Sequence, residues 1–213
     1  MPEIIVFLGP SCDLGTATRI LPEAEFRPPA ARGDIAAAAA EGVRVIGLID
    51  GVFLQDCAVG HREVLGALRA GVVVIGASSM GALRAAELDS LGMIGIGEVY
   101  HRFRSGALES DDEVALVYDP ESGCALSEPL VNMRATLEAA VQARTVSAED
   151  AESVLRAARS LYFPERTWSG VLRTVPLGEE QRARLAAFVR TSAVDLKRAD
   201  ALAALEYIRA HFT

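Results

Sequence analysis

Short apolar runs, each followed by a polar turn, alternate with helical patterns in the first half of the chain. The runs Ile4–Leu8, Val43–Ile49 and Val72–Ile75 are rich in β-branched residues, and the first and third contain no polar position. Strands that are buried on both faces of a sheet have this composition. The pattern predicts three parallel strands, and the run Val114–Tyr118 is a candidate for a fourth.

Helical patterns separate these runs. Residues 58–71 place an apolar residue every three or four positions and end at Gly71, and residues 33–42 form an Ala-rich segment that Asp34 is expected to cap. Strands that alternate with helices in this way form an open parallel sheet. We therefore predict an α/β fold with an open, mostly parallel, Rossmann-like sheet.

The second half of the chain has a different sequence pattern. From about Ser127 onward, long patterns rich in Ala, Leu, Arg and Glu predict helices, and Ser147 with Asp150 resembles a capping box. We expect an α/β core over residues 1–138 and a helical C-terminal subdomain or arm over residues 139–213.

Polar, turn-forming residues follow each of the three predicted strands. The carboxyl ends of parallel strands meet at one edge of the sheet, where ligands bind in folds of this class. The turns at these ends are Gly9-Pro10-Ser11-Cys12, Asp50-Gly51 and Gly76-Ala77-Ser78-Ser79. The sequence therefore predicts one crevice that these residues line.

The turn after the third strand suggests a nucleophile. Residues 77–81 fit the pattern small-x-Ser-x-Gly, a relaxed nucleophile elbow with Ser79 in the nucleophile position. A helix that starts near Met80 offers N–H groups to a developing oxyanion. The structural alternative is that Ser78 or Ser79 caps this helix, and both interpretations stay open. The glycine spacing matches neither a P-loop nor G-x-G-x-x-G.

A serine nucleophile needs a base. His61 is the histidine expected at the same sheet edge, and Asp50 is a better candidate than Glu63 to orient its imidazole, because residues two apart on a helix diverge. Cys12 is a rival nucleophile, although a small buried cysteine is the simpler interpretation.

Other polar residues have a structural interpretation beside a functional one. Arg32 lies in a proline-stiffened loop, where it could bind a carboxylate ligand or be an ordinary loop residue. The acidic residues of segment 109–113 fit a helix N-terminus better than a metal site. Five further polar residues, each taken by itself, are interpreted as helix caps, salt-bridge partners or solvated residues: Asn132, Arg134, Arg166, Lys197 and Arg198.

Composition narrows the class of protein. The 213 residues carry a net charge of −8 and a pI near 5.0, which disfavours nucleic-acid binding. Three cysteines without a C-x-x-C pair suggest neither a zinc site nor a disulfide framework. The apolar run near the N-terminus is too short for a signal peptide or a membrane span. We expect a cytoplasmic protein without a metal, a cofactor or a membrane partner.

Several longer blocks, taken in order, resemble one family. They are VFLGPS, PPAARGD, IGLIDGVF, HREVL at residue 61, GASSMGALRAAEL, GMIGIGEVY, DDEVAL, SEPLVNMR and YFPERTW. This set is similar to the TfuA-like family, and the similarity is strongest over residues 4–138.

The resemblance implies a partner protein in peptide backbone thioamidation, in which a YcaO enzyme replaces an amide oxygen by sulfur. It implies delivery of sulfur by hydrolysis of a C-terminal thiocarboxylate on a ThiS-type ubiquitin-like carrier, with a precursor peptide as a further possible partner. The alternative is a non-catalytic adaptor that binds the YcaO enzyme. Ser79, His61 and Asp50 are the expected catalytic residues. The expected substrate-binding residues are Ser78, Gly76, Gly9, Ser11, Arg32, Gly51, Asn132 and Arg134.

Two positions depart from the family pattern. Gly60 stands before the histidine where the family has an aromatic residue, and Pro129 stands in SEPLVNMR where a helix former is usual. Proline is tolerated in the first turn of a helix, so neither departure removes an expected catalytic residue.

Overall fold

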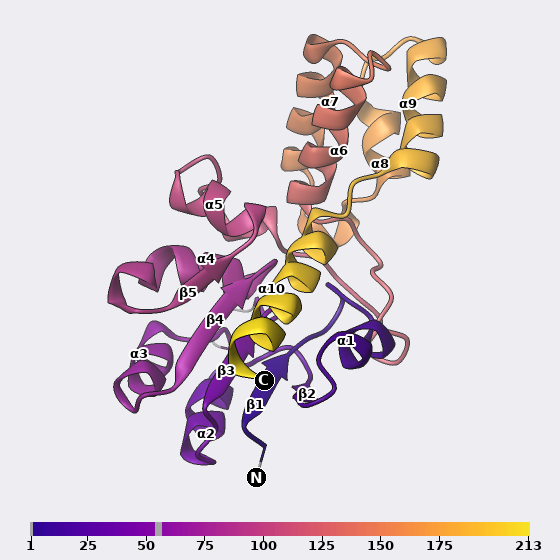
Figure 1. Cartoon of the computed structure of the whole chain (residues 1–213). Helices are drawn as coiled ribbons and strands as arrows, with labels where there is room; N and C mark the ends of the chain where they lie inside the picture. The colour runs from indigo at the N-terminus through magenta and orange to yellow at the C-terminus, as the bar shows by residue number, and fades with distance from the viewer. Residues whose placement is uncertain (1, 54–56) are drawn as a thin grey trace. The chain divides into compact units, whose positions relative to one another are not determined.

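A computed structural model describes residues 2–53 and 57–213 (Figure 1). The chain forms two compact units, each with its own core. Unit 1 comprises residues 1–111 and 197–213, and unit 2 comprises residues 112–196. Unit 1 is therefore discontinuous in sequence, because unit 2 is inserted ahead of the last helix.

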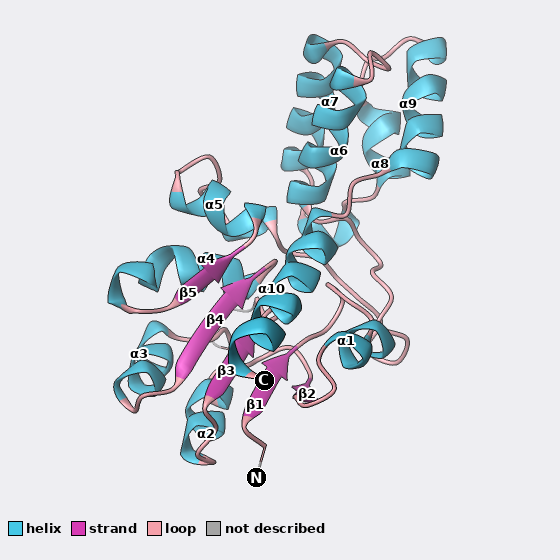
Figure 2. Ribbon diagram, viewed as in Figure 1, coloured by secondary structure: helices cyan, strands magenta, loops and turns pink. Residues whose placement is uncertain are grey.

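Unit 1 is built on a parallel sheet, drawn as arrows in Figure 2. Its described strands lie in the order β2-β1-β3-β4-β5, and every neighbouring pair is parallel. This order belongs to doubly wound sheets of the flavodoxin type, whose ligands bind outside the carboxyl ends of β1 and β3. The predicted α/β fold class is confirmed. The strands are β1 (Ile4–Phe7), β2 (Glu25–Arg27), β3 (Val45–Leu48), β4 (Val73–Ala77) and β5 (Ile94–Ile96).

Both faces of the sheet are covered, because alternate residues of each strand point to opposite faces. Ile5 and Phe7 of β1 pack in one core with helices α2, α3 and α4, whereas Ile4 and Val6 pack in a second core with α1 and α10. The helices of unit 1 are α1 (Leu14–Ile20), α2 (Asp34–Ala40), α3 (His61–Arg69), α4 (Met80–Leu88), α5 (Glu98–Arg104) and α10 (Leu196–Phe212), with the 3-10 turn η1 (Asp89–Leu91).

The C-terminal helix α10 lies along the sheet of unit 1 (Figure 1). Its buried residues Ala201, Ala204, Leu205 and Ile208 join the core that contains the strand residues Val45 and Ile75. The helix thus completes one face of a sheet whose strands all lie more than 90 residues earlier in the chain.

Unit 2 is helical and has a separate core. Its core residues include Met133, Leu137, Val154 and Leu185, which come from three different helices. The elements are η2 (Asp111–Glu113), α6 (Leu130–Gln142), α7 (Ala148–Ser160), η3 (Phe163–Glu165), α8 (Trp168–Thr174) and α9 (Glu179–Ser192). Ser147 caps α7 through its hydroxyl, which accepts the Asp150 N–H over 3.0 Å, as the capping box predicts.

The structure differs from the sequence prediction in three respects. β2 and β5 were not expected, and the run Val114–Tyr118 does not form a strand, although Tyr118 makes an isolated antiparallel bridge to Ala125. Gly33, rather than Asp34, occupies the N-cap position of α2. The units also divide at residues 111 and 196 rather than at 138, because α6 packs with the helices of unit 2 while α10 returns to the sheet.

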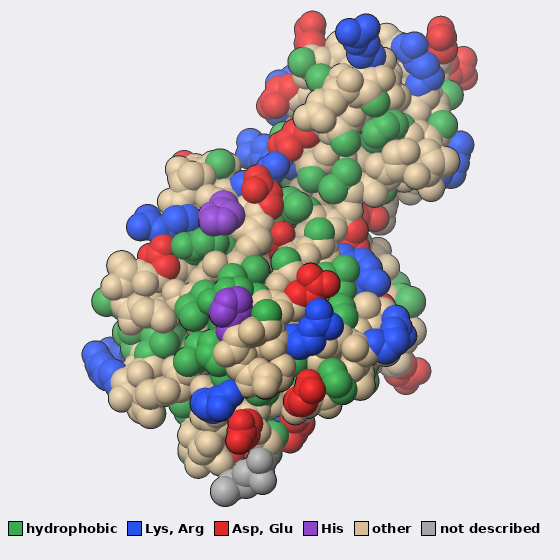
Figure 3. All heavy atoms as spheres, in the orientation of Figure 1, with side chains coloured by type: hydrophobic (Ala, Val, Ile, Leu, Met, Phe, Trp, Pro, Cys, Tyr) green, Lys and Arg blue, Asp and Glu red, His purple; other side chains and the backbone are tan. Residues whose placement is uncertain are grey.

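Charged side chains of both signs are mixed over the face drawn in Figure 3. Such mixing is typical of a solvated surface rather than of a nucleic-acid-binding face, which concentrates positive charge. No helix within residues 2–53 and 57–213 is both long and apolar enough to cross a bilayer.

Candidate functional site

The turn after β4 is strained at Ser78. Ser78 follows the last residue of β4 and has φ +65°, in the left-handed region that residues other than glycine rarely adopt. The Ser79 N–H donates to the Ala77 carbonyl over 2.7 Å and closes a three-residue turn around Ser78. A γ-turn of this hand is rare and strained, and strain of this kind concentrates at functional sites. Ser78 therefore has the backbone geometry of a nucleophile elbow.

A chain of hydrogen bonds leads from Ser78 to Asp50. The Ser78 hydroxyl donates to Ser11 Oγ over 2.9 Å, and the Ser11 hydroxyl donates to Asp50 Oδ1 over 2.7 Å. These residues follow β4, β1 and β3, so the carboxyl edge of the sheet brings together positions 39 and 67 residues apart. Both hydroxyl protons point toward the carboxylate, which is the direction a proton travels from a nucleophile to a base.

The Asp50 carboxylate is held in a fixed orientation. Its Oδ2 accepts the Gly9 N–H over 2.8 Å and the Ser11 N–H over 3.1 Å, while its Oδ1 accepts the Ser11 hydroxyl. Three donors from the turn after β1 thus converge on one side chain of the turn after β3. The carboxyl ends of the adjacent strands β1 and β3 form the switch point of the sheet, where ligand sites of doubly wound folds lie.

Lys197 adds a positive charge to this group. Its Nζ lies 4.0 Å from Asp50 Oδ1, and both side chains are only 3% exposed. Lys197 is the second residue of α10, so the site draws on the C-terminal helix as well as on three strand ends. Of the sequence interpretations of Lys197 as a cap, a salt bridge or a solvated residue, the salt bridge fits its contact with Asp50, and the solvated residue is corrected by its burial.

Ser79 and His61 are placed differently from Ser78. Ser79 occupies the N-cap position of α4, but its side chain makes no capping hydrogen bond. The His61 imidazole is half exposed and its Nε2 lies 2.8 Å from Glu87 Oε2. Among the described residues, no hydrogen bond joins His61 to either serine or to Asp50. The assignment of Ser79 as nucleophile with His61 as base stays a prediction.

Glu63 has a structural role in this structure. One of its carboxylate oxygens accepts the Gly60 N–H over 2.7 Å, and the other accepts the N–H groups of Gly33 and Ile35. It therefore ties the start of α3 to the start of α2 and does not orient the His61 ring.

The glycines of the predicted crevice lie against protein atoms. A Cβ on Gly76 would stand 2.1 Å from the Gly81 carbonyl oxygen, and one on Gly81 would stand 1.7 Å from the Leu48 carbonyl oxygen. Gly9 and Gly51 are similarly close to Pro29 and Met80. These glycines let the turns and α4 approach the strands, which brings Ser78, Ser11 and Asp50 within hydrogen-bonding distance.

The remaining predicted substrate-binding residues make hydrogen bonds elsewhere in the structure. The Arg32 N–H donates to the Cys57 carbonyl over 2.6 Å. In unit 2, Asn132 Nδ2 donates to Asp195 Oδ1 over 2.9 Å, and Arg134 donates to Glu113 Oε1 over 2.7 Å. Their roles in substrate binding stay predictions.

Cys12 is buried, as the simpler interpretation expected. Burial raises the pKa of its thiol, although the Arg198 guanidinium, 3.4 Å from the sulfur, acts in the opposite direction. A thiol that holds its proton more tightly is a weaker nucleophile at neutral pH, which favours Ser78 over Cys12.

Comparison with known families adds to this geometry. The family model described as TfuA-like protein matches residues 50–167, more than half of the chain. The chain belongs to the TfuA-like family. The match includes Asp50 and the Ser78 turn, whereas Ser11 and Lys197 lie outside it. No curated protein gives a significant match.

The site of this TfuA-like protein consists of oxygen and nitrogen groups suited to proton transfer. Within the described part of the chain, no three His, Cys, Asp or Glu side chains gather as a metal-binding group. The hydroxyls of Ser78 and Ser11, the Asp50 carboxylate and the Lys197 ammonium form the candidate machinery.

Proposed function

We propose that this TfuA-like protein is an acyl-transfer hydrolase that releases sulfide from the C-terminal thiocarboxylate of a ThiS-type carrier protein. The sulfide would supply a YcaO enzyme during thioamidation of a peptide backbone. Family membership supports the pathway. The observation that carries the chemistry is the strained Ser78 at the head of a hydrogen-bond chain to Asp50.

Ser78 is the nucleophile of the proposed reaction. Its oxygen attacks the thiocarboxylate carbon while its proton passes to Ser11, and the proton of Ser11 passes to Asp50. The proton returns to the sulfur as the carbon–sulfur bond breaks, so that hydrosulfide leaves and an ester on Ser78 remains. Water then attacks the ester, which restores Ser78 and releases the carrier as a carboxylate.

The helix α4 stabilises the negative charge that develops on the carbonyl oxygen. Met80, two residues after Ser78, begins α4, so the positive end of the helix dipole lies next to the nucleophile. A site of this kind is effective because the donors are fixed before the reaction and water is excluded.

Access to Ser78 requires the site to open. The Ser78 side chain has no exposed surface, and Ser79, Ser11 and Asp50 are each exposed by 3% or less. We infer that docking of the carrier or of the YcaO enzyme uncovers the turn. Closure in the absence of both keeps water away from the unreacted site.

Sulfide release from a thiocarboxylated ThiS-type carrier tests this proposal. The protein is assayed alone and with its YcaO partner, and Ser78→Ala is compared with the neighbouring variants Ser79→Ala and His61→Ala. Removal of the nucleophile should lower kcat by at least about 10³-fold, while the neighbouring variants keep most of the activity. Trapping of an acyl adduct on Ser78, located by peptide mass spectrometry, gives an independent measurement.

The outcomes separate the possible roles of the turn. Full activity of Ser78→Ala would contradict the proposed nucleophile. Loss in Ser79→Ala and His61→Ala, with Ser78→Ala active, would restore the assignment made from the sequence pattern. No release by the wild type under either condition would contradict the hydrolase.

A non-catalytic adaptor is the second candidate, and the organisation of unit 2 favours it. Residues 112–196 fold around their own core and present Tyr162, which is 64% exposed and stacks edge-on against Phe163. Exposed aromatic residues on a folded module are typical of protein-binding surfaces.

Binding of the YcaO enzyme tests the adaptor. Tyr162→Asp should weaken the complex measured by calorimetry, whereas Ser160→Asp, which adds the same charge on the preceding turn, should not. Equal affinities for the two variants would count against this surface. Truncation of the C-terminal third is not a suitable test, because it also removes α10 from unit 1.

A further inference from the structure

The use of basic residues in this chain is uneven. Of the 21 Lys and Arg residues, only Lys197 is a lysine. This single lysine is buried, whereas buried lysines are uncommon unless they are paired. The chain therefore uses an ammonium group at one position, beside Asp50, and guanidinium groups everywhere else.

The chemistry of the two cations explains this choice. A guanidinium binds a carboxylate through two parallel hydrogen bonds, and would compete for the Asp50 oxygens with Gly9, Ser11 N–H and the Ser11 hydroxyl. An ammonium is a compact charge. At 4.0 Å from Oδ1, Lys197 supplies the charge and leaves the three hydrogen bonds to Asp50 in place.

We propose that Lys197 is a positioning residue whose charge, paired with the buried Asp50 carboxylate, fixes the direction of the hydrogen-bond chain. This inference rests on the proposed function of Ser78. An ionised carboxylate only accepts hydrogen bonds, so the Ser11 hydroxyl must donate to it and its oxygen is left to accept from Ser78. A protonated Asp50 would be able to donate to Ser11, which would turn the chain around.

The position of Lys197 is fixed by contacts that do not involve Asp50. Asp200, three residues further along α10 and on the same side of the helix, accepts the N–H groups of Glu98 and Val99 over 2.9 and 2.7 Å. Gly97 leaves room for this contact, because a Cβ there would stand 2.2 Å from Asp200 Cγ. The apolar residues of α10 pack on the sheet as well. Lys197 is thus held in place by the helix that carries it.

Among the described residues, two segments beside Asp50 carry further charged or titratable groups. The turn after β1 contributes Cys12 and Asp13, and α10 contributes Arg198, which lies 3.2 Å from Asp13 Oδ2. Arg198 and Asp13 are therefore paired with each other, whereas Lys197 is paired with Asp50.

The pH dependence of sulfide release is the first test. Lys197→Met should shift the acid limb of kcat/KM to higher pH by roughly one unit or more, because an opposite charge at this distance favours the ionised carboxylate. KM should change little. Lys197→Arg should restore the limb but not the full kcat, since the guanidinium competes for Asp50. Arg209→Met, which removes a charge from the exposed end of the same helix, is the matched control and should behave as the wild type.

A second measurement does not depend on activity. Lysine labelled with ¹³C at Cε gives one signal from a side chain, because the chain has one lysine. We expect the chemical shift of a charged ammonium across the neutral range, and a change of that shift in Asp50→Asn but not in Asp13→Asn.

Each result supports or overturns the role of Lys197. Equal loss of rate by Lys197→Met at every pH, together with a lower melting temperature, would reduce Lys197 to a structural residue. A Lys197 side chain that is a neutral amine at pH 7 would be a base, which would overturn the positioning role. An unchanged Lys197 signal in Asp50→Asn would overturn it as well. The two measurements can also disagree. If the lysine signal changes in Asp50→Asn but the wild type releases no sulfide, the hydrolase is overturned and the Lys197–Asp50 pairing stays supported.

Discussion

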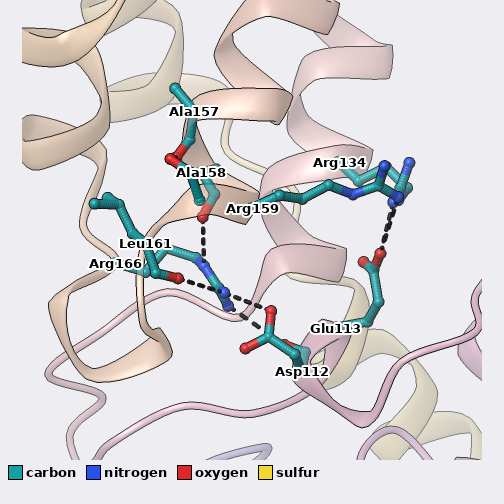
Figure 4. Close-up of polar contacts among 9 residues, drawn as sticks. Asp112, Glu113, Arg134, Ala157, Ala158, Arg159, Leu161 and Arg166 are labelled. Carbon is teal, nitrogen blue, oxygen red and sulfur yellow. Dashed lines mark hydrogen bonds and ion pairs between the residues drawn. The ribbon is translucent and has the colours of Figure 1, made fainter.

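Both units of the molecule contain a buried polar network, and the two networks are built in opposite ways. In unit 2, Arg166 is completely buried and uses all three guanidinium nitrogens: it donates to the carbonyls of Ala158, Asp112 and Leu161 and to Asp112 Oδ2 (Figure 4). In unit 1, Ser78, Ser11 and Asp50 form a chain that begins at a strained hydroxyl.

The difference indicates what each network does. Arg166 satisfies main-chain carbonyls at the end of α7 and in the loop that follows, so its bonds hold segments of chain together. In unit 1 the hydroxyls of Ser78 and Ser11 donate in sequence toward the Asp50 carboxylate, which also accepts two main-chain N–H groups. The first arrangement stabilises a fold, and the second is the one that the proposed proton transfer uses.

Unit 2 also shows what an incompletely satisfied ion cluster looks like. Glu113 Oε1 accepts from Arg134 over 2.7 Å and from Arg159 over 3.4 Å (Figure 4). Among the described residues, Glu113 Oε2 and Arg134 Nε are buried without a hydrogen-bond partner. Asp50 differs, because both of its oxygens accept hydrogen bonds.

Removal of Arg166 should have the larger effect on stability. Arg166→Met removes one donor from each of three carbonyls and breaks the ion pair with Asp112, so the free energy of unfolding should fall by about 3 kcal/mol. Urea unfolding of unit 2, followed by the fluorescence of Trp168, measures this change. A loss below about 0.5 kcal/mol would show that the network does not stabilise the unit.

A pair of buried serines sharpens the comparison between the units. Ser11→Ala breaks the chain from Ser78 to Asp50 and should lower kcat about 10²-fold with a small change in stability. Ser127, a buried serine of unit 2, only accepts the Val117 N–H, so Ser127→Ala should lower stability and leave kcat unchanged. Equal catalytic effects of the two substitutions would remove the distinction between the networks.

The smallest effect is expected at Cys12. Its pKa is raised by burial, so alkylation at neutral pH should modify the exposed Cys57 and Cys124 well before Cys12, and the rate at Cys12 should increase only at alkaline pH. Cys12→Ala should keep sulfide release within about twofold of the wild type. Rapid inactivation by modification of Cys12 at neutral pH would make the thiol a competitor of Ser78.

The central strands were predictable because strands buried on both faces are rich in β-branched residues. β1, β3 and β4 are central strands covered on both faces, and their β-branched runs identify them. β2 and β5 are three-residue edge strands, with the sequences EFR and IGI, and they contain too few residues to show a pattern. The return of α10 to the sheet is a tertiary event that the amphipathic pattern of one helix does not specify.

The site was predictable in position but not in detail. Strand ends indicated the edge where Ser11, Asp50 and Ser78 meet. The choice between Ser78 and Ser79 depends on a backbone angle, and the contact of His61 with Glu87 joins residues 26 positions apart. Lys197 lies 147 positions after Asp50, and only its uniqueness among the basic residues distinguishes it in the sequence.

The interruption of unit 1 by unit 2 has a consequence for biosynthesis. A nascent chain that ends at residue 196 contains all the described strands and all three candidate serines, but lacks the helix that covers one face of the sheet. Domains fold as synthesis proceeds from the N-terminus, so α10 can dock on the sheet only after unit 2 has been synthesised. That helix brings Lys197 to Asp50, so a chain that stops before residue 197 would lack the buried charge that the proposed role of Ser78 uses.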